Sequence, residues 1–305
     1  MSPDNRDVLV HERLAAAGLS RAASTIAGLV KPAIRLKTTR VPEDTIPVGA
    51  SKVGGLPDLP RGADWPWWKG LPLPFVAQIN LAEAAPFDDE RALPPTGLLL
   101  FFWTDMRWDA GRDNVEWVYG TDPVQGRVIY APAGAPLKRQ PIPANPAFDD
   151  GWLACAVTYL PHPTLPSAQS AAIAGLALDQ QEQDRYDDLV REIHGLDTNS
   201  AHDHPSHWLL GYPEPMQGDD MAMECQYAAH GLSHEEMYPD HHGLPFVPSA
   251  ELVAGIADWR LLLQMGEDDN AGMQWNDSGC IYYWMRRQDL QGRRFDQARV
   301  VEQSL

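Results

Sequence analysis

Histidine side chains gather in one stretch of this chain. Seven of the ten histidines lie between residues 202 and 242, and three of them, His202, His204 and His207, have the spacing H-x-H-x-x-H. Imidazole is the commonest metal ligand in proteins, and an extended backbone places His202 and His204 on one face. The pattern predicts a divalent metal ion bound by these three histidines. The alternative is a solvated loop and a protein without a cofactor, because proline and glycine are frequent in the same stretch.

Two neighbouring segments resemble metal-binding motifs but fail them. His234 and Glu235 begin an H-E-x-x-H pattern, yet Tyr238 stands where the second histidine is needed. A metalloprotease requires both histidines on one helical face, so that activity is excluded for this segment. The carboxylates of residues 267–269 are consecutive, whereas a calcium loop alternates its ligands towards a glycine. We therefore expect a polar hairpin loop there.

Two glutamines interrupt apolar runs: Gln78 in FVAQINL and Gln264 in LLLQMGE. A buried amide needs hydrogen-bond partners, and these are usually protein groups, which favours a structural role. The other interpretation is that both amides line a ligand-binding cleft. Gln78 and Gln264 are therefore candidate binding residues.

Covalent and nucleotide chemistry find no support in the sequence. Cys225 is a candidate nucleophile near the histidines, yet a lone cysteine among apolar neighbours is more often simply buried. The chain contains no G-x-G-x-x-G, no P-loop and no G-x-S-x-G. These observations favour a protein without enzymatic activity. The alternative is a metal-dependent enzyme that uses the histidine-rich segment 202–242.

The charge of the chain indicates which partners to expect. The net charge is −18, and residues 201–280 hold fourteen acidic residues against one arginine, a net −13. Such a surface repels nucleic acid and anionic membranes. It predicts an acidic face that recognises a basic protein through Asp219 and Asp220, with Trp208 and Tyr212 as aromatic contacts. The alternative is that acidity only keeps the protein soluble and the aromatic side chains point inward.

Several elements are predicted to position these residues. Residues 179–194 have a helical apolar pattern that ends at Gly195. The apolar runs that hold the two glutamines are each followed by a polar loop, a glycine and an aromatic-rich run. This similarity predicts a duplicated β-unit covering about 50–131 and 205–305.

The N-terminus and the cysteines indicate the compartment. The N-terminus shows no signal-peptide pattern, and the apolar stretch 14–30 is interrupted by Arg21 and is a poor membrane span. The three cysteines, Cys155, Cys225 and Cys280, are far apart and odd in number, which predicts reduced thiols. We expect a cytoplasmic protein.

Five segments together resemble the YwqG-like family of bacterial proteins. In the first half they are SKVGGLPDLPRGADWP (51–66), PLPFVAQINL (72–81) and GLLLFFW (97–103). In the second half they begin at HWLLGYPEP (207–215) and WRLLLQMGE (259–267). The resemblance implies a compact α+β structure and leaves the activity open, because the family is a domain of unknown function. Some relatives lie near polymorphic toxin genes, which implies an immunity-like role.

The predicted fold class is α+β, with duplicated, mainly antiparallel β-units and a few packed helices. The predicted domains are an N-terminal helical extension over residues 1–30 and a YwqG-like domain over 31–305. The predicted function is a non-enzymatic binding module for a protein partner. The sequence does not determine the oligomeric state.

Overall fold

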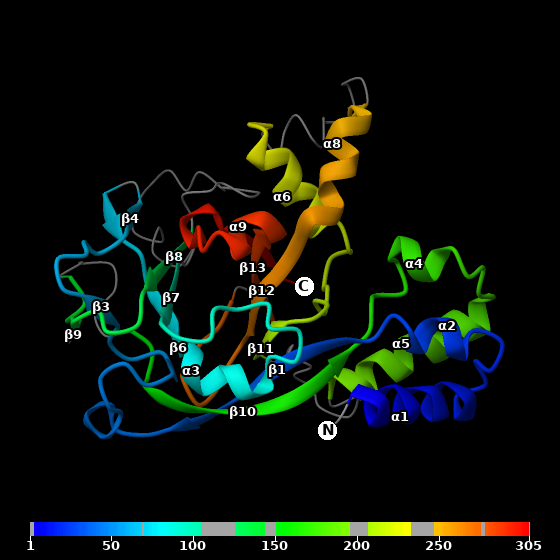
Figure 1. Ribbon diagram of the computed structural model, residues 1–305, viewed down its shortest axis with the longest axis horizontal. Coiled ribbons are helices and arrows are strands. Elements are labelled where there is room, and N and C mark those ends of the chain that lie inside the picture. The colour runs from blue at the N-terminus through cyan, green and yellow to red at the C-terminus, as the bar shows by residue number, and fades with distance from the viewer. Residues whose placement is uncertain are drawn as a thin grey trace.

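One strongly curved β-sheet dominates the computed structural model (Figure 1). The structure describes residues 3–68, 70–104, 126–143, 151–195, 207–232, 247–275 and 278–304. Within these residues the sheet has ten strands, and each of its described strand pairs is antiparallel. In spatial order they are β14 (Arg299–Gln303), β13 (Cys280–Arg286), β12 (Trp259–Gly266), β11 (His207–Leu210), β1 (Lys31–Arg40), β10 (Cys155–Thr164), β2 (Lys52–Val53), β6 (Phe75–Asn80), β7 (Leu98–Trp103) and β8 (Gly126–Ala131).

Shorter elements surround this sheet. Two small pairs join β3 (Asp58–Pro60) to β9 (Leu137–Arg139) and β4 (Trp67–Trp68) to β5 (Leu71–Pro72). The α-helices are α1 (Pro3–Ala16), α2 (Ala23–Ala27), α3 (Leu81–Ala84), α4 (Ala171–Ala174), α5 (Gln180–His194), α6 (Met221–Ala229), α8 (Ala250–Ala254) and α9 (Arg287–Gln291). The 3-10 helices are η1 (Glu43–Thr45), η2 (Ala85–Phe87), η4 (Gly255–Asp258) and η5 (Phe295–Gln297). Among the described helices, none is both long and apolar enough to cross a membrane.

The structure contradicts the predicted fold class. Strands from both predicted units, 50–131 and 205–305, belong to one continuous, mainly antiparallel sheet, and the helices are few. β1 and β10 join them at the centre through ten residue pairs. Duplicated units are not shown. The similar apolar runs predict the local strands correctly, but they carry no information about which distant strands pair.

Local predictions fare better than the fold class. Helix α5 begins one residue after the predicted start and ends where predicted, because Asp179 and Glu182 form a capping box at its start and Gly195 ends it with a left-handed φ of 71°. Its buried face packs with α1 and α2 in a helical core that includes Leu14, Ile26 and Tyr186. The proposed boundary between residues 1–30 and 31–305 stays a prediction.

The curvature of the sheet brings its two edge strands, β8 and β14, together. Aromatic rings of Phe101 and Tyr283 meet across the interior at 5.0 Å between centroids. At the seam, by which we mean the contact between Gly126 of β8 and Val300 of β14, a Cβ atom on Gly126 would lie 2.3 Å from Val300 Cγ2. Gly126 therefore allows an approach that any larger residue would obstruct.

Replacing Gly126 by alanine should destabilise the protein. The new methyl group would overpack the seam, a defect that costs about 1–3 kcal/mol. Chemical denaturation of four proteins (wild type, Gly126→Ala, Val300→Ala and the double variant) measures the coupling. The alanine at 126 should cost less in the Val300→Ala background. Equal costs in both backgrounds would contradict the steric explanation.

Candidate functional site

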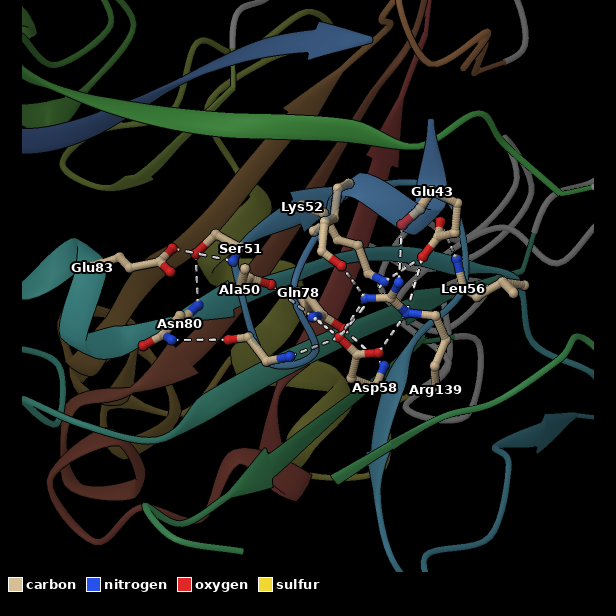
Figure 2. A network of polar contacts seen from close by, with 12 residues as sticks. Glu43, Ala50, Ser51, Lys52, Leu56, Asp58, Gln78, Asn80, Glu83 and Arg139 are labelled. Atoms are coloured by element: carbon tan, nitrogen blue, oxygen red, sulfur yellow. Dashed lines mark hydrogen bonds and ion pairs between the residues drawn. The ribbon is translucent and has the colours of Figure 1, made fainter. Parts of the chain in front are cut away.

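A buried network of polar side chains holds residues 43–58 against the sheet (Figure 2). Its centre is the Asp58 carboxylate, which accepts hydrogen bonds from Gly49 N (2.9 Å), Gln78 Nε2 (2.8 Å) and Arg139 Nε (2.8 Å). Burial by itself raises the pKa of Asp58, but these donors outweigh it and the pKa is lowered. Asp58 is therefore a stably ionised structural residue.

Lys52 adds a second cation to this network. Its wholly buried ammonium lies 2.9 Å from the Glu43 carboxylate and 3.7 Å from that of Asp58. Burial lowers the pKa of Lys52, and the hydrogen bond to Glu43 and the charge of Asp58 oppose that shift. Two carboxylates thus offset Lys52 and Arg139, which leaves the network electrically balanced.

Gln78 belongs to the same network. Its Oε1 accepts from Asp58 N at 2.9 Å, and its Nε2 donates to Ala50 O at 2.7 Å as well as to Asp58. The side chain is wholly buried. These contacts explain Gln78 as a structural residue, and a binding role for it stays a prediction.

A second buried network surrounds Gln264. Its Oε1 accepts from Glu214 N at 2.8 Å, and the Tyr282 hydroxyl donates to Glu214 O. The Glu214 carboxylate is hydrogen-bonded to His194 Nδ1, while Leu165 N donates to His194 Nε2 at 3.1 Å. Because Nε2 is an acceptor, the proton of a neutral His194 lies on Nδ1. This network fixes the loop after β11 against α5.

His162 lies beside His194, with ring centroids 6.0 Å apart. Its Nε2 is buried and has no hydrogen-bond partner within the described part of the chain. Burial, reinforced by His194 and Arg35, lowers the pKa of His162 to about 3. His162 is therefore neutral at physiological pH and is poorly suited to general acid catalysis.

A half-buried charged cluster forms around Tyr212 at the end of the sheet. Tyr212 N donates to Thr164 Oγ1 at 2.9 Å, and Trp208 Nε1 donates to Tyr212 O at 3.0 Å. These bonds place the Tyr212 ring 4.0 Å from Lys31 Nζ. Arg260 is close by and contacts the Glu90 carboxylate at 3.4 Å.

Asp219 is the unusual member of this region. Burial, and then the charge of Asp220, raise the pKa of Asp219 to about 6. No cation of the described residues lies within ion-pair distance of it. Ionisation of Asp219 is therefore less favourable in the free protein than in water, and an incoming cation would stabilise the carboxylate. Together with Lys31, Glu90, Tyr212, Asp220 and Arg260 it defines what we call the Tyr212 cluster.

Most of the predicted binding residues come together here. Trp208 pairs with Gln264 across β11 and β12, Tyr212 follows β11, and the charge of Asp219 reaches Tyr212. Gln78 belongs to the other network. Trp208 and Gln264 are wholly buried, so they support the cluster from beneath, while Tyr212, Asp219 and Asp220 are half-buried.

The predicted metal ligands are partly outside the described residues, which exclude His202 and His204. His207 is buried, and its Nε2 lies 3.2 Å from Asp268 Oδ2. The described residues contain no group of three or more side chains suited to hold a metal. The metal site therefore stays a prediction.

Sequence reasoning missed Lys31, Glu90 and Arg260 as neighbours of Tyr212. Strand pairing brings β1, with Lys31, and β12, with Arg260, to the two sides of β11, and the loop after η2 brings Glu90 to Arg260. A weak signal was available, because Arg260 is the one basic residue in the acidic stretch 201–280.

Comparison with known proteins identifies the family. The chain belongs to the family described as "Domain of unknown function (DUF1963)", whose model matches residues 51–303. None of the curated proteins compared with the chain matches it significantly. The match includes Asp58, Gln78, Tyr212 and Asp219, whereas Lys31 lies before it.

Replacing Asp219 by asparagine should stabilise the protein above pH 6. The pKa of Asp219 is about 6 in the folded state, above the usual value near 3.9 of an unfolded chain. Ionisation therefore costs stability as pH rises from about 4 to about 6. The gain from Asp219→Asn should be about 1–2 kcal/mol at pH 7 and vanish near pH 4. Urea denaturation across this pH range measures it, with Asp258→Asn as the exposed control. A gain independent of pH would contradict the assignment.

The three thiols should be free and unreactive in the folded protein. Cys155, Cys225 and Cys280 are buried and unpaired, which confirms the predicted thiol state. Burial raises the pKa of Cys155 to about 12 and raises those of the other two, which opposes thiolate formation. After denaturation without reductant, an aromatic disulfide reagent should titrate three thiols. With the native protein, the same reagent should react at least about a hundredfold more slowly. Rapid reaction of Cys225 in the native protein would contradict this expectation and favour the hypothesis that Cys225 is a nucleophile.

Proposed function

We propose that this protein is a non-enzymatic binding module that recognises a basic protein through Asp219 and Asp220. The observation that carries the proposal is the half-buried Asp219 carboxylate, which has no cation within ion-pair distance among the described residues. A lysine or arginine of a partner would neutralise it in a partly desolvated place, where charge pairs are strong. We further propose a YwqG-like bacterial protein with a cytoplasmic, immunity-like role.

The surroundings of Asp219 support a recognition site. Tyr212 is half-buried next to it, and tyrosine is enriched at the centres of protein interfaces. Trp208 and Gln264 lie beneath and fix the loop through hydrogen bonds to Tyr212 and Glu214. A loop held in this way presents its carboxylates with little ordering cost on binding.

The alternative is a metal-dependent enzyme that uses residues 202–242. Its ligands His202 and His204 lie outside the described residues, and His207 already contacts Asp268. Metal analysis of the purified protein distinguishes the two proposals. Stoichiometric metal that is lost in His204→Ala would favour the enzyme.

Charge reversal at Asp219 and Asp220 should weaken partner recognition. The partner is first isolated from the source cell, and its association rate with wild type and Asp219→Lys/Asp220→Lys is then measured at low and physiological salt. We expect the partner to be basic and its association rate with the wild type to fall as the salt concentration rises. The association rate of the variant should be at least about tenfold lower than that of the wild type. Affinity for the wild type should also weaken below pH 6, where Asp219 becomes protonated.

The matched control is Asp258→Lys, which reverses an exposed carboxylate on η4. Circular dichroism and thermal unfolding establish that each variant is folded. An acidic partner, or binding that is indifferent to salt and to the charge of residues 219 and 220, would overturn the proposal.

A further inference from the structure

The strand order brings basic side chains to one end of the sheet. β1, β11 and β12 are neighbours in the sheet; Lys31 begins β1, Arg260 lies near the start of β12, and Tyr212 follows β11. β13 is the next strand, and Arg287 follows it directly as the first residue of α9. The Lys31 ammonium lies over the Tyr212 ring, 4.0 Å from its centroid.

These cations are not matched by carboxylates. Among the residues that the structure describes, Lys31 and Arg287 have no acidic partner within 4.0 Å. Arg260 reaches Glu90 at 3.4 Å, and both of those side chains are substantially exposed to solvent. Within the described residues, one carboxylate, that of Glu90, thus lies within ion-pair distance of these three basic groups, although the whole chain carries a net charge of −18.

The environment of Lys31 makes this imbalance significant. Burial lowers the pKa of Lys31, Arg260 and Arg287 lower it further, and Glu90 opposes them. The cationic form is therefore less favourable here than in water, although the Tyr212 ring offsets part of that cost. An anion bound next to Lys31 would remove the remaining cost.

We infer that Lys31, Arg260 and Arg287 form a binding site for a small oxyanion, a carboxylate or phosphate group, beside the Tyr212 ring. A guanidinium presents a planar pair of N–H donors that matches such a group, and an ammonium adds a compact charge. Burial raises the pKa of Tyr212, so its hydroxyl keeps its proton and is a further donor. The site adjoins Asp219 and Asp220 in the Tyr212 cluster, but the inference does not rest on partner recognition by those carboxylates.

The alternative is that no anion is bound: the aliphatic part of the Lys31 side chain only covers apolar surface, and the two arginines are solvated. The two interpretations differ in stoichiometry and in residue dependence. A built site saturates at one anion per chain and is lost with any of its cations, whereas solvated cations attract anions weakly and interchangeably.

Titration of the full-length protein with inorganic phosphate, and separately with succinate, tests the site at constant ionic strength and pH 7.5. Calorimetry should show saturable one-to-one binding of at least one of these probes. Arg287→Gln, Arg260→Gln and Lys31→Met should each weaken it by about tenfold, the loss of one charge-assisted hydrogen bond. The matched control is Arg61→Gln, which removes an exposed arginine on the segment between β3 and β4 and should bind like wild type.

The pKa of Lys31 gives a second measurement. Carbon NMR of labelled lysine should show it below its ordinary value in the free protein and raised when the anion is bound, because the anion favours the ammonium. Arg287→Gln is exposed and should fold normally, so it keeps the test valid if Lys31→Met does not fold. Binding that does not saturate, or that is equal in all variants, means an adventitious ion only and would overturn the inference. No partner protein is present in these titrations, so their failure would leave the proposed partner recognition untouched.

Discussion

The pairing of β1 with β10 is the constraint on which the rest of the sheet depends. Ten consecutive residue pairs join Lys31–Arg40 to Cys155–Thr164. On their other edges β1 pairs with β11 and β10 pairs with β2. The end of this ladder also positions the Tyr212 cluster. Thr164 Oγ1 donates to Lys31 O and accepts from Tyr212 N, so one hydroxyl links the two central strands to the loop after β11.

Curvature is the second consequence of this continuous pairing. A twisted antiparallel sheet of this length must expose its edges or bring them together. Here the interior is filled by large side chains such as Phe101 and Tyr283, and Gly126 lets β8 approach β14. The two edge strands thus come into contact at Gly126 and Val300, and η5 packs against β8.

How far the sequence predicts this molecule depends on the separation of the interacting residues. Helix α5 is predictable because its capping box and its terminal glycine lie within or next to the helix. The strands that contain Gln78 and Gln264 are likewise recognisable from their apolar runs. The fold class is not, because the partner of each strand is set by contacts across the whole chain. Asp58 and Arg139 illustrate this: they are 81 residues apart, and neither has a local signal for the ion pair.

A comparison of Asp58, which is buried, with Asp219, which is half-buried, shows where function can arise in this fold. Both side chains are withdrawn from water, yet their pKa values shift in opposite directions. Asp58 is surrounded by donors from Gly49, Gln78 and Arg139, so its charge is already stabilised and a ligand could add little. Asp219 has a carboxylate neighbour where Asp58 has a guanidinium. The fold does not offset the free-energy cost of ionising Asp219, so a cation from a binding partner could offset it. This difference between the two carboxylates favours the Tyr212 cluster over the network around Asp58 as the functional site.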